Sequence, residues 1–294
     1  MKNTDGRILA NTSICAYSRF VPERADDYAW ENDRVAFRVY WLGAERMAKA
    51  GEVGGTLSSG IDCWVKRVQY PIIDKWYKMD VRGKGSYRVD HGEYLDDYHV
   101  GSSRGYGGIG VWYNDSLYVS DNFVACETTE SSPIRTGFIL DYAPRNSGNT
   151  TIKEIKHIPF DLSSKLTKIE IQFAFPYMEE VLAGLYIPEY NQGNVNADEK
   201  AGWFSYRSKH CDSELGIGIA GEPKYIVGYT EYRIGKPEKS HLFARFRPVD
   251  GKLIYYTGFG WRKSGQFRTL KEWNNYLSDF ADCLAASIKV EIKN

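Results

Sequence analysis

No charge of either sign is in excess in this chain of 294 residues. The 38 Lys and Arg side chains are balanced by 38 Asp and Glu side chains, so the formal net charge is zero. Nucleic acids and anionic membranes both select for a basic excess in their partners. We therefore expect neither nucleic acid nor a membrane as a partner of this protein.

Long apolar runs are also missing. No stretch approaches the about 20 apolar residues that a membrane-spanning helix requires. The opening residues, MKNTDGRILANTS, are too polar for a signal peptide. We therefore expect a cytoplasmic protein, or a periplasmic one if an export signal was removed from this chain.

Cysteine is scarce and its spacing defines no scaffold. The five cysteines are odd in number, lie far apart and include no CxxC pair. This excludes a zinc ribbon or a thioredoxin motif, and a disulfide framework is not expected at this length. The GxxxxGK[ST] nucleotide loop and the HExxH zinc motif are absent as well. We expect no cofactor and no metal, and most cysteines should be small buried side chains.

Aromatic residues, in contrast, are abundant, with 22 Tyr and 8 Trp in the chain. Their flat faces suit strands and also suit sugar rings. From Leu117 onwards, short apolar segments such as PIRTGFILDYAP and LTKIEIQFAF are separated by turn sequences such as RNSGNT. This spacing indicates an antiparallel meander or sandwich rather than βα units. We predict a mainly β protein, an antiparallel β-sandwich, with one domain over residues 1–294.

One helix is predicted, near the C-terminus. Thr269 and Glu272 form a capping box, and apolar residues follow at helical spacing. These apolar residues are Leu270, Trp273, Leu277, Phe280 and Leu284.

Residues 41–60, which are rich in glycine and small residues, are interpreted as a loop. Residues 61–77 are interpreted as a strand with a bulge.

The segment Phe20–Tyr40 concentrates charge. Its first fifteen positions place seven charged side chains around Trp30 and Asn32, with neither helical spacing nor strand alternation before Arg34. We interpret it as a polar loop that leads into a strand from Val35 onwards. Loops held by sheets often carry binding groups. The alternative is an ion-pair network that only stabilises the strand.

The strongest catalytic candidates lie in residues 87–124. His91, Tyr98 and Arg104 occur there, and five glycines follow between Gly101 and Gly110. Glycine at this density lets the backbone bend sharply and approach a ligand closely. A metal site is the second interpretation of this segment, with Asp90, His91 and Glu93 as ligands. We rank it lower because three such residues within four positions do not match the helical spacing of known zinc motifs.

Four motifs together resemble a family of bacterial proteins known as a domain of unknown function, DUF4861. They are FVPERADDYAWENDRVAFRVY, SGIDCWVKRVQYPIIDKWY, DHGEYLDDYHVGSSRGYGGIGVW and PIRTGFILDYAP. The resemblance extends over most of the chain from about Phe20. It implies a β-supersandwich of the galactose-mutarotase type and a role in polysaccharide degradation.

The chain departs from the family pattern at two places. Tyr94 stands where family members usually have glycine, and Asp97 stands where they have an aromatic residue. Family members also usually carry a β-rich stretch before the FVPER motif. We therefore expect either a compact branch of the family or a chain that lacks part of the sandwich.

The resemblance further implies a β-elimination on uronic-acid oligosaccharides. One enzyme of ulvan degradation associated with the family is a dehydratase that leaves a 4,5-unsaturated uronic acid. Such a reaction needs a base for the C5 proton, an acid for the oxygen leaving C4, and a cation on the carboxylate. We assign His91 as base, Tyr98 as acid, with these two roles exchangeable, and Arg104 as carboxylate clamp.

Further residues of the motifs are assigned to substrate binding. They are Arg24, Trp30, Asn32, Arg34, Trp64, Lys66 and Arg67. Trp30 and Trp64 should stack on sugar faces, while the cations and Asn32 bind an acidic oligosaccharide, the expected partner. By composition alone, Lys66 and Arg67 could equally be a surface basic pair.

Other functions remain open at this point. A polysaccharide lyase would share the elimination but release a sugar instead of water. A non-catalytic carbohydrate-binding sandwich would use its aromatic residues alone. A mutarotase or epimerase is third, because the Arg and Lys residues of the motifs favour an acidic substrate.

Overall fold

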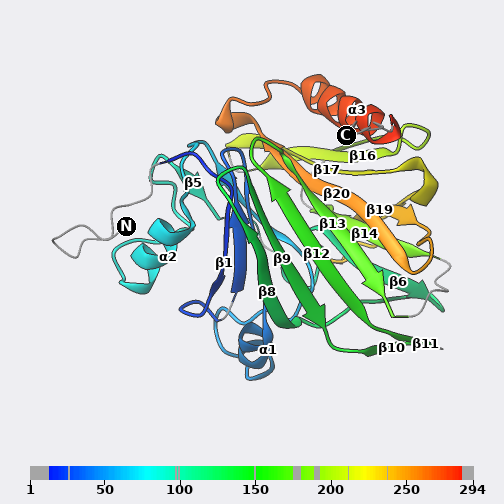
Figure 1. The fold of residues 1–294 in the computed structure, drawn as a ribbon, viewed down its shortest axis with the longest axis horizontal. Coiled ribbons are helices and arrows are strands. Elements are labelled where there is room, and N and C mark those ends of the chain that lie inside the picture. The colour runs from blue at the N-terminus through cyan, green and yellow to red at the C-terminus, as the bar shows by residue number, and fades with distance from the viewer. Residues whose placement is uncertain are drawn as a thin grey trace, which may run out of the picture.

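The computed structural model describes residues 13–25, 27–96, 98, 100–148, 150–174, 180–188, 193–210, 212–236 and 238–286. Antiparallel strands make up most of this part, and helix α3 (Leu270–Ala285) lies across the outside of the largest sheet (Figure 1). The predicted mainly β sandwich with a C-terminal helix is confirmed. No helix in these ranges is long and apolar enough to cross a membrane.

The large sheet contains eight strands, and all its neighbouring strands are antiparallel. In spatial order they are β15 (Asn194–Asp198), β16 (Trp203–His210), β17 (Ser213–Gly221), β20 (Lys252–Trp261), β13 (Leu166–Phe173), β12 (Glu154–Asp161), β9 (Arg135–Tyr142) and β8 (Phe123–Ser131). Side chains alternate between the two faces of each strand. In β12 the inner face buries Ile158 and Phe160, while His157 is only half-buried on the outer face.

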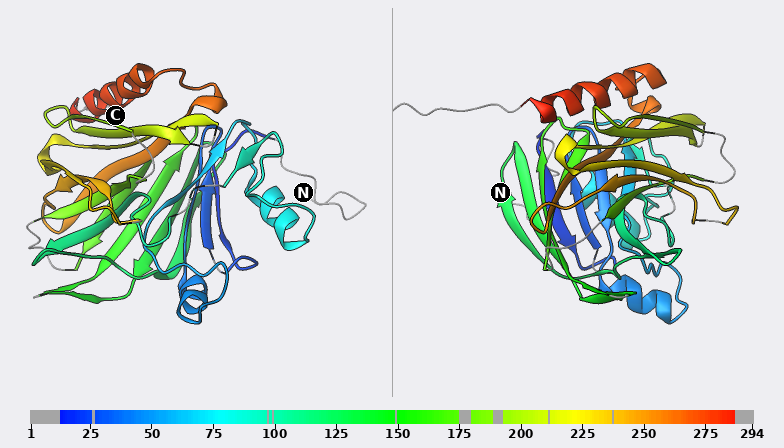
Figure 2. Two further views of the ribbon diagram at one scale, coloured as in Figure 1. Left: turned by 180° about the vertical axis from the view of Figure 1, so that it is seen from behind. Right: turned by 90° about the vertical axis from the view of Figure 1, so that its right-hand side faces the viewer.

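Two smaller sheets cover the inner face of the large sheet. The small sheet consists of β18 (Ile226–Tyr232), β19 (His241–Phe246), β14 (Val181–Tyr186), β6 (Tyr106–Tyr113) and β7 (Ser116–Tyr118). The N-terminal sheet consists of β1 (Tyr17–Val21), β2 (Asp27–Glu31), β3 (Ala36–Val39), β4 (Asp62–Lys66) and β5 (Tyr94–Leu95). Phe246 of the small sheet stacks on Tyr255 at 5.6 Å. Phe37 of the N-terminal sheet packs edge-on against Phe160 at 5.9 Å and Phe259 at 5.3 Å, so one core serves all three sheets. Figure 2 shows the ribbons of the sheets from two further directions.

Short elements complete the described part. They are α1 (Leu42–Lys49), α2 (Ile73–Val81), the hairpin β10 (Arg145–Ser147) and β11 (Thr150–Ile152), and the 3₁₀ turns η1 (Pro223–Tyr225) and η2 (Arg262–Ser264). Helix α1 contradicts the loop predicted for residues 41–60. Helix α2 contradicts the bulged strand predicted for residues 61–77, of which only β4 is a strand. The buried residues of α2, Ile73, Trp76 and Tyr77, follow helical spacing. The two aromatic residues among them favour a strand by composition, which explains the wrong prediction.

The charged segment Phe20–Tyr40 is also different from the prediction. Residues Asp27–Glu31, interpreted as loop, form the completely buried strand β2. Their charges are buried because partners neutralise them: Glu31 accepts from Lys66 Nζ at 2.7 Å. Arg38 of β3 forms ion pairs with Asp62 at 2.5 Å and with a second buried aspartate, Asp96. A buried strand that carries paired charges shows no polar–apolar alternation, which is why the pattern failed.

Helix α3 confirms its predicted cap and apolar stripe. The Thr269 hydroxyl accepts from the Glu272 backbone N–H at 3.2 Å, and the Glu272 carboxylate accepts from the Arg268 N–H at 2.8 Å. Trp273 and Leu277 are buried against the outer face of the large sheet. Strand β17 leaves room for them with glycine: a Cβ on Gly218 would lie 2.7 Å from Leu277 Cδ1.

The glycine-rich segment from Gly101 to Gly110 brings the chain close to itself. Gly105 has a φ of +55°, and a Cβ there would lie 2.0 Å from the carbonyl oxygen of Ile61. The Tyr106 N–H donates to that carbonyl at 2.9 Å. The expected close approach of the backbone therefore exists, but at Gly105 the backbone approaches another backbone segment and not a ligand.

Candidate active site

The two tryptophans predicted to stack on sugars are core residues. Trp30 has no exposed surface, stacks on Phe37 with ring centres 5.4 Å apart, and donates from Nε1 to the Thr167 hydroxyl at 3.0 Å. Trp64 is equally buried and stacks on Tyr87 at 5.6 Å. Neither indole offers a face to a ligand, so the prediction of sugar stacking is wrong for both.

Asn32 and Lys66 are structural for the same reason. The Asn32 amide donates to the carbonyl oxygens of Asp161 at 2.7 Å and Ser164 at 2.6 Å. The Lys66 ammonium group donates to Glu31 and to the Asn32 carbonyl, both at 2.7 Å. Both side chains are buried, and they fix the β2–β3 turn onto the large sheet. The predicted role in substrate binding is therefore contradicted for both residues.

Arg24 and Arg34 lie at opposite ends of strand β2. Arg24 is half-buried and donates from Nε to the Tyr87 hydroxyl at 3.0 Å. Arg34 forms an ion pair with Asp33 at 2.9 Å, and its carbonyl accepts from the Gln266 amide at 3.2 Å. The structure does not bring the two arginines together, so they do not form the single cleft wall that was predicted.

The segment Asp90–Glu93 spreads its three potential ligands in different directions. Asp90 forms an ion pair with Arg67, the exposed His91 ring stacks on Trp76 at 5.0 Å, and Glu93 forms an ion pair with Lys75 at 2.6 Å. Carboxylates that already neutralise separate cations do not form a ligand set. Within the described ranges, no group of three His, Cys, Asp or Glu side chains could hold a metal ion.

Arg67 marks the place where the N-terminal sheet meets the large sheet. Its guanidinium lies 5.6 Å above the ring of Trp261, the last residue of β20. Nearby, Lys263 forms an ion pair with Asp212 in the β16–β17 turn at 2.5 Å. Asp90 lies within electrostatic range of both groups. The loop that carries Asp90 therefore borders the turn between β16 and β17.

Arg104, the predicted carboxylate clamp, is an interior residue with 1 % of its surface exposed. Its guanidinium donates to the Ser59 hydroxyl at 2.9 Å, to the Ser58 hydroxyl at 3.3 Å and to the Ile109 carbonyl at 3.4 Å. No contact between described residues joins this guanidinium to Tyr98. The hydrogen bonds of this guanidinium are to groups of the protein interior, so the predicted role as a carboxylate clamp is not supported.

His241 holds the backbone at Arg104. Its Nε2 accepts from the Arg104 N–H at 3.0 Å, and its Nδ1 donates to the Lys239 carbonyl at 2.9 Å. Burial lowers the pKa of His241 to about 3, so the ring is neutral at physiological pH. Because both nitrogens have partners and the ring does not take up a proton, His241 is a positioning residue.

Tyr98 lies in a cluster of rings at the end of the sandwich. Its ring centre is 4.3 Å from that of Tyr106, 5.9 Å from that of Tyr186 and 6.3 Å from that of His210. Tyr98 and His210 are both half-buried. Burial raises the pKa of the Tyr98 phenol well above its ordinary value, so this hydroxyl keeps its proton. The Tyr98–His210 pair thus places a protonated phenol beside an imidazole.

A cation lies beside Tyr206 on the strand that carries His210. Tyr206 and His210 point to the same face of β16, because their positions differ by an even number. The guanidinium of Arg233 lies 5.9 Å above the Tyr206 ring. Arg233 forms an ion pair with exposed Glu231, and its own side chain is 43 % exposed. An exposed ion pair of this kind is weak, so an anionic ligand can compete for Arg233.

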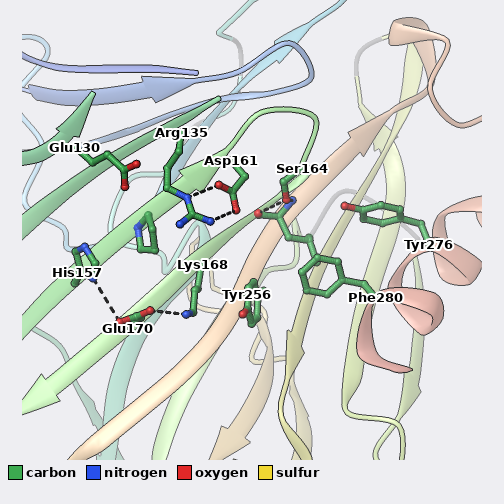
Figure 3. Close-up of a pocket in the computed structure, with 12 residues that line it drawn as sticks. Glu130, Arg135, His157, Asp161, Ser164, Lys168, Glu170, Tyr256, Tyr276 and Phe280 are labelled. Atoms are coloured by element: carbon green, nitrogen blue, oxygen red, sulfur yellow. Dashed lines mark hydrogen bonds and ion pairs between the residues drawn. The ribbon is translucent and has the colours of Figure 1, made fainter. Parts of the chain in front are cut away.

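A groove of about 490 Å³ lies elsewhere, on the outer face of the large sheet beside α3 (Figure 3). Four of its charged side chains form two ion pairs: Arg135 with Asp161 at 2.5 Å, and Glu170 with Lys168 at 2.5 Å. Tyr256 and Phe280 line one side, with ring centres 4.9 Å apart. None of the predicted site residues lines this groove.

These observations describe a layered antiparallel β protein with a Tyr–His pair at one end, and comparison with known proteins places it in a family. A family model described as "Domain of unknown function (DUF4861)" matches residues 3–290, so the chain belongs to that family. The "Uncharacterized protein P7" of Formosa agariphila is 41 % identical over 291 residues, which are 98 % of this chain and 73 % of P7.

A solved structure of a "Putative kojibiose phosphorylase from human microbiome" is also similar. The match has 10 % sequence identity and a TM-score of 0.39, and it covers 61 % of this chain. The chain spans about a quarter of that phosphorylase, since the match covers 25 % of its length. At this level of similarity the match says nothing about activity.

Sequence reasoning missed His210, Arg233 and Tyr186. His210 ends an alternating strand sequence, WFSYRSKH, in which only the position at the strand end distinguishes it from a packed residue. Arg233 and Tyr186 also end or follow strands. Strand ends that carry His, Tyr or Arg were the available signal, but which ends meet in space depends on the order of strands in the sheets.

Proposed function

We propose that this protein is a carbohydrate-active enzyme that catalyses β-elimination on uronic-acid-containing oligosaccharides. The reaction we favour is dehydration of the non-reducing terminal uronic acid to a 4,5-unsaturated sugar, as in ulvan-type substrates. The observation that carries the proposal is the Tyr98–His210 pair, with its ring centres 6.3 Å apart. Exposed Arg233, which lies over Tyr206 of the strand that carries His210, supplies a cation. Membership of the DUF4861 family supports it.

The three groups fit the three tasks of the reaction. Arg233 binds the uronate carboxylate and makes the C5 proton more acidic. His210 takes the C5 proton, the C5 electron pair forms the C4=C5 double bond, and the C4–O bond breaks. Tyr98, which burial keeps protonated, gives its proton to the leaving oxygen. The leaving group is water for a dehydratase and a sugar for a lyase.

Two substitutions at this pair test the proposal against a matched histidine control. Tyr98→Phe and His210→Ala should each lower kcat by at least about 100-fold, because each removes a proton-transfer group. His91→Ala should stay within about threefold of the wild type, since His91 stacks on Trp76 and belongs to another cluster. The assay uses uronic-acid oligosaccharides and follows the absorbance of the unsaturated uronate.

The mass of the product separates the two eliminations. Loss of one water without chain cleavage identifies a dehydratase, whereas shorter chains identify a lyase. Full activity of His210→Ala, or a loss confined to His91→Ala, would refute the assignment of His210 as base. Absence of any unsaturated product from a broad panel of uronate oligosaccharides would reject elimination itself.

A non-catalytic carbohydrate-binding role is the second candidate, and the outer groove favours it. The half-buried rings of Tyr256 and Phe280 lie beside paired polar groups there, a combination found in sugar-binding sites. This candidate predicts saturable binding without a new chromophore. Tyr256→Ala should then weaken binding, while Tyr98→Phe should leave it unchanged.

A further inference from the structure

Three cations cluster inside the sandwich between β6, β10 and the inner face of β12. We call Arg104, Arg145, Lys156 and Glu154 the inner cationic cluster. Arg104 and Lys156 are 1 % and 3 % exposed, and Glu154 is 1 % exposed. The Lys156 ammonium lies 3.8 Å from a Glu154 oxygen and 4.1 Å from the centre of the Tyr142 ring.

Arg145 is the member of the cluster without partners. Its Nε, Nη1 and Nη2 are each shielded from solvent, and none has a hydrogen-bond partner among the residues that the structure describes. The hydroxyl of Ser147 is also shielded from solvent and has no hydrogen-bond partner among the described residues. Ser147 lies two positions after Arg145, on the same face of β10. Arg145 as a whole is half-buried, so the cluster reaches towards the surface at this residue.

The charges of the cluster do not balance. Glu154 is its one buried carboxylate, and one of that carboxylate's oxygens already accepts from the Ser120 hydroxyl. Exposed Asp121 also attracts Arg145, which leaves three cations against two carboxylates. Burial lowers the pKa of each of the three cations, and repulsion from Arg145 lowers the pKa of Arg104 and Lys156 further. Buried charge without compensation is costly, and so are buried donors without acceptors. A bound anion would relieve both costs.

We propose that Arg145, with Ser147 beside it and Arg104 and Lys156 behind it, forms a binding site for an oxyanion group, a carboxylate or a sulfate. A guanidinium presents two parallel N–H groups that match the oxygens of either anion. The three unpartnered nitrogens of Arg145 supply such donors. The more deeply buried cations, Arg104 and Lys156, supply a positive electrostatic potential that attracts an anion. An oxyanion fits these groups better than a cation or a neutral ligand, because every unpartnered nitrogen is a positively charged donor.

This site is separate from the residues proposed for elimination. It uses none of Tyr98, His210 and Arg233, and it is tested by binding alone. The proposal therefore stands or fails independently of the catalytic one.

Calorimetric titration of the full chain with sodium sulfate, and separately with sodium glucuronate, at constant ionic strength tests the site. Wild-type protein should bind at least one of these anions saturably, with chloride as the reference, and the preferred anion identifies the ligand class. Arg145→Gln should weaken that binding at least tenfold. The control Arg262→Gln removes an exposed arginine that is paired with Glu214, and it should bind as the wild type does.

Thermal unfolding provides a second measurement that does not depend on heat of binding. The preferred anion should raise the Tm of the wild type and of Arg262→Gln, because a ligand stabilises the form that binds it. Arg145→Gln should show a smaller shift, and Arg145→Lys, which keeps charge but loses the planar fork, should lie between. Equal binding and equal Tm shifts in wild type and Arg145→Gln, or no saturable binding of either anion to the wild type, would overturn the proposal.

Discussion

Two rings at the same end of the sandwich differ in what they can do with a proton. His241 has partners on both nitrogens, and burial lowers its pKa to about 3. Tyr98 instead has its pKa raised by burial and lies beside the half-buried ring of His210. The residue type alone does not tell whether a side chain positions its neighbours or transfers a proton. The hydrogen bonds that the side chain already makes, and its exposure, distinguish the two roles.

At the same scale, Asp96 should make stability depend on pH. It lies 2.8 Å from Arg38, but burial outweighs that attraction and raises its pKa to about 8. The folded protein therefore keeps a proton that the unfolded chain releases near pH 4, so this contribution to stability is present at low pH and is lost as pH rises towards 8. The pKa of Asp27 is raised to about 6, so Asp96 dominates this effect between pH 6 and pH 8.

Urea unfolding at pH 6, 7 and 8 measures this effect. The wild-type free energy of unfolding should fall by up to about 1.4 kcal/mol per pH unit relative to Asp96→Asn, which cannot release a proton. The control Asp161→Asn, at an exposed ion pair with Arg135, should retain the wild-type slope. Identical slopes for Asp96→Asn and wild type would contradict the assignment.

At the scale of elements, helix α3 begins where the local sequence predicts, at the Thr269 cap. Thr269 caps the helix as the sequence indicated, with its hydroxyl 3.2 Å from the Glu272 nitrogen. Thr269→Ala should lower the free energy of unfolding by about 1 kcal/mol, since an N–H group loses its acceptor. Thermal or urea unfolding measures this loss, and Lys271→Ala, at an exposed position of the same turn, serves as control. A Thr269→Ala variant as stable as the control would show that the cap contributes nothing.

For the molecule as a whole, the class of fold could be predicted but the site only in part. The spacing of the strands and the capping box are local sequence patterns, so the β-sandwich and helix α3 could be predicted from them. Strand β2 was missed because Lys66, distant in sequence, and Arg38 of the next strand neutralise its charges and those of its neighbours. Tyr98 and His210 meet through the order of strands in the sheets, and no spacing along the chain encodes that contact.

The shared core makes a prediction about cooperativity at this scale. Phe37 of the N-terminal sheet packs on Trp30 within its own sheet and on Phe160 and Phe259 of the large sheet. A single core of this kind should give one unfolding transition, with tryptophan fluorescence and far-UV circular dichroism following the same curve in urea. This would agree with one domain over residues 1–294.

Phe37→Ala should shift that transition without splitting it. Removing a fully buried phenylalanine costs about 3–5 kcal/mol, and here the lost contacts belong to both sheets. Both probes should therefore move together to lower urea. Val53→Ala, at a residue that is 97 % exposed, is the control and should leave the midpoint unchanged. Two separate transitions in the wild type or in Phe37→Ala would mean that the N-terminal sheet folds as its own unit, and the interface through Phe37 would then not couple the sheets.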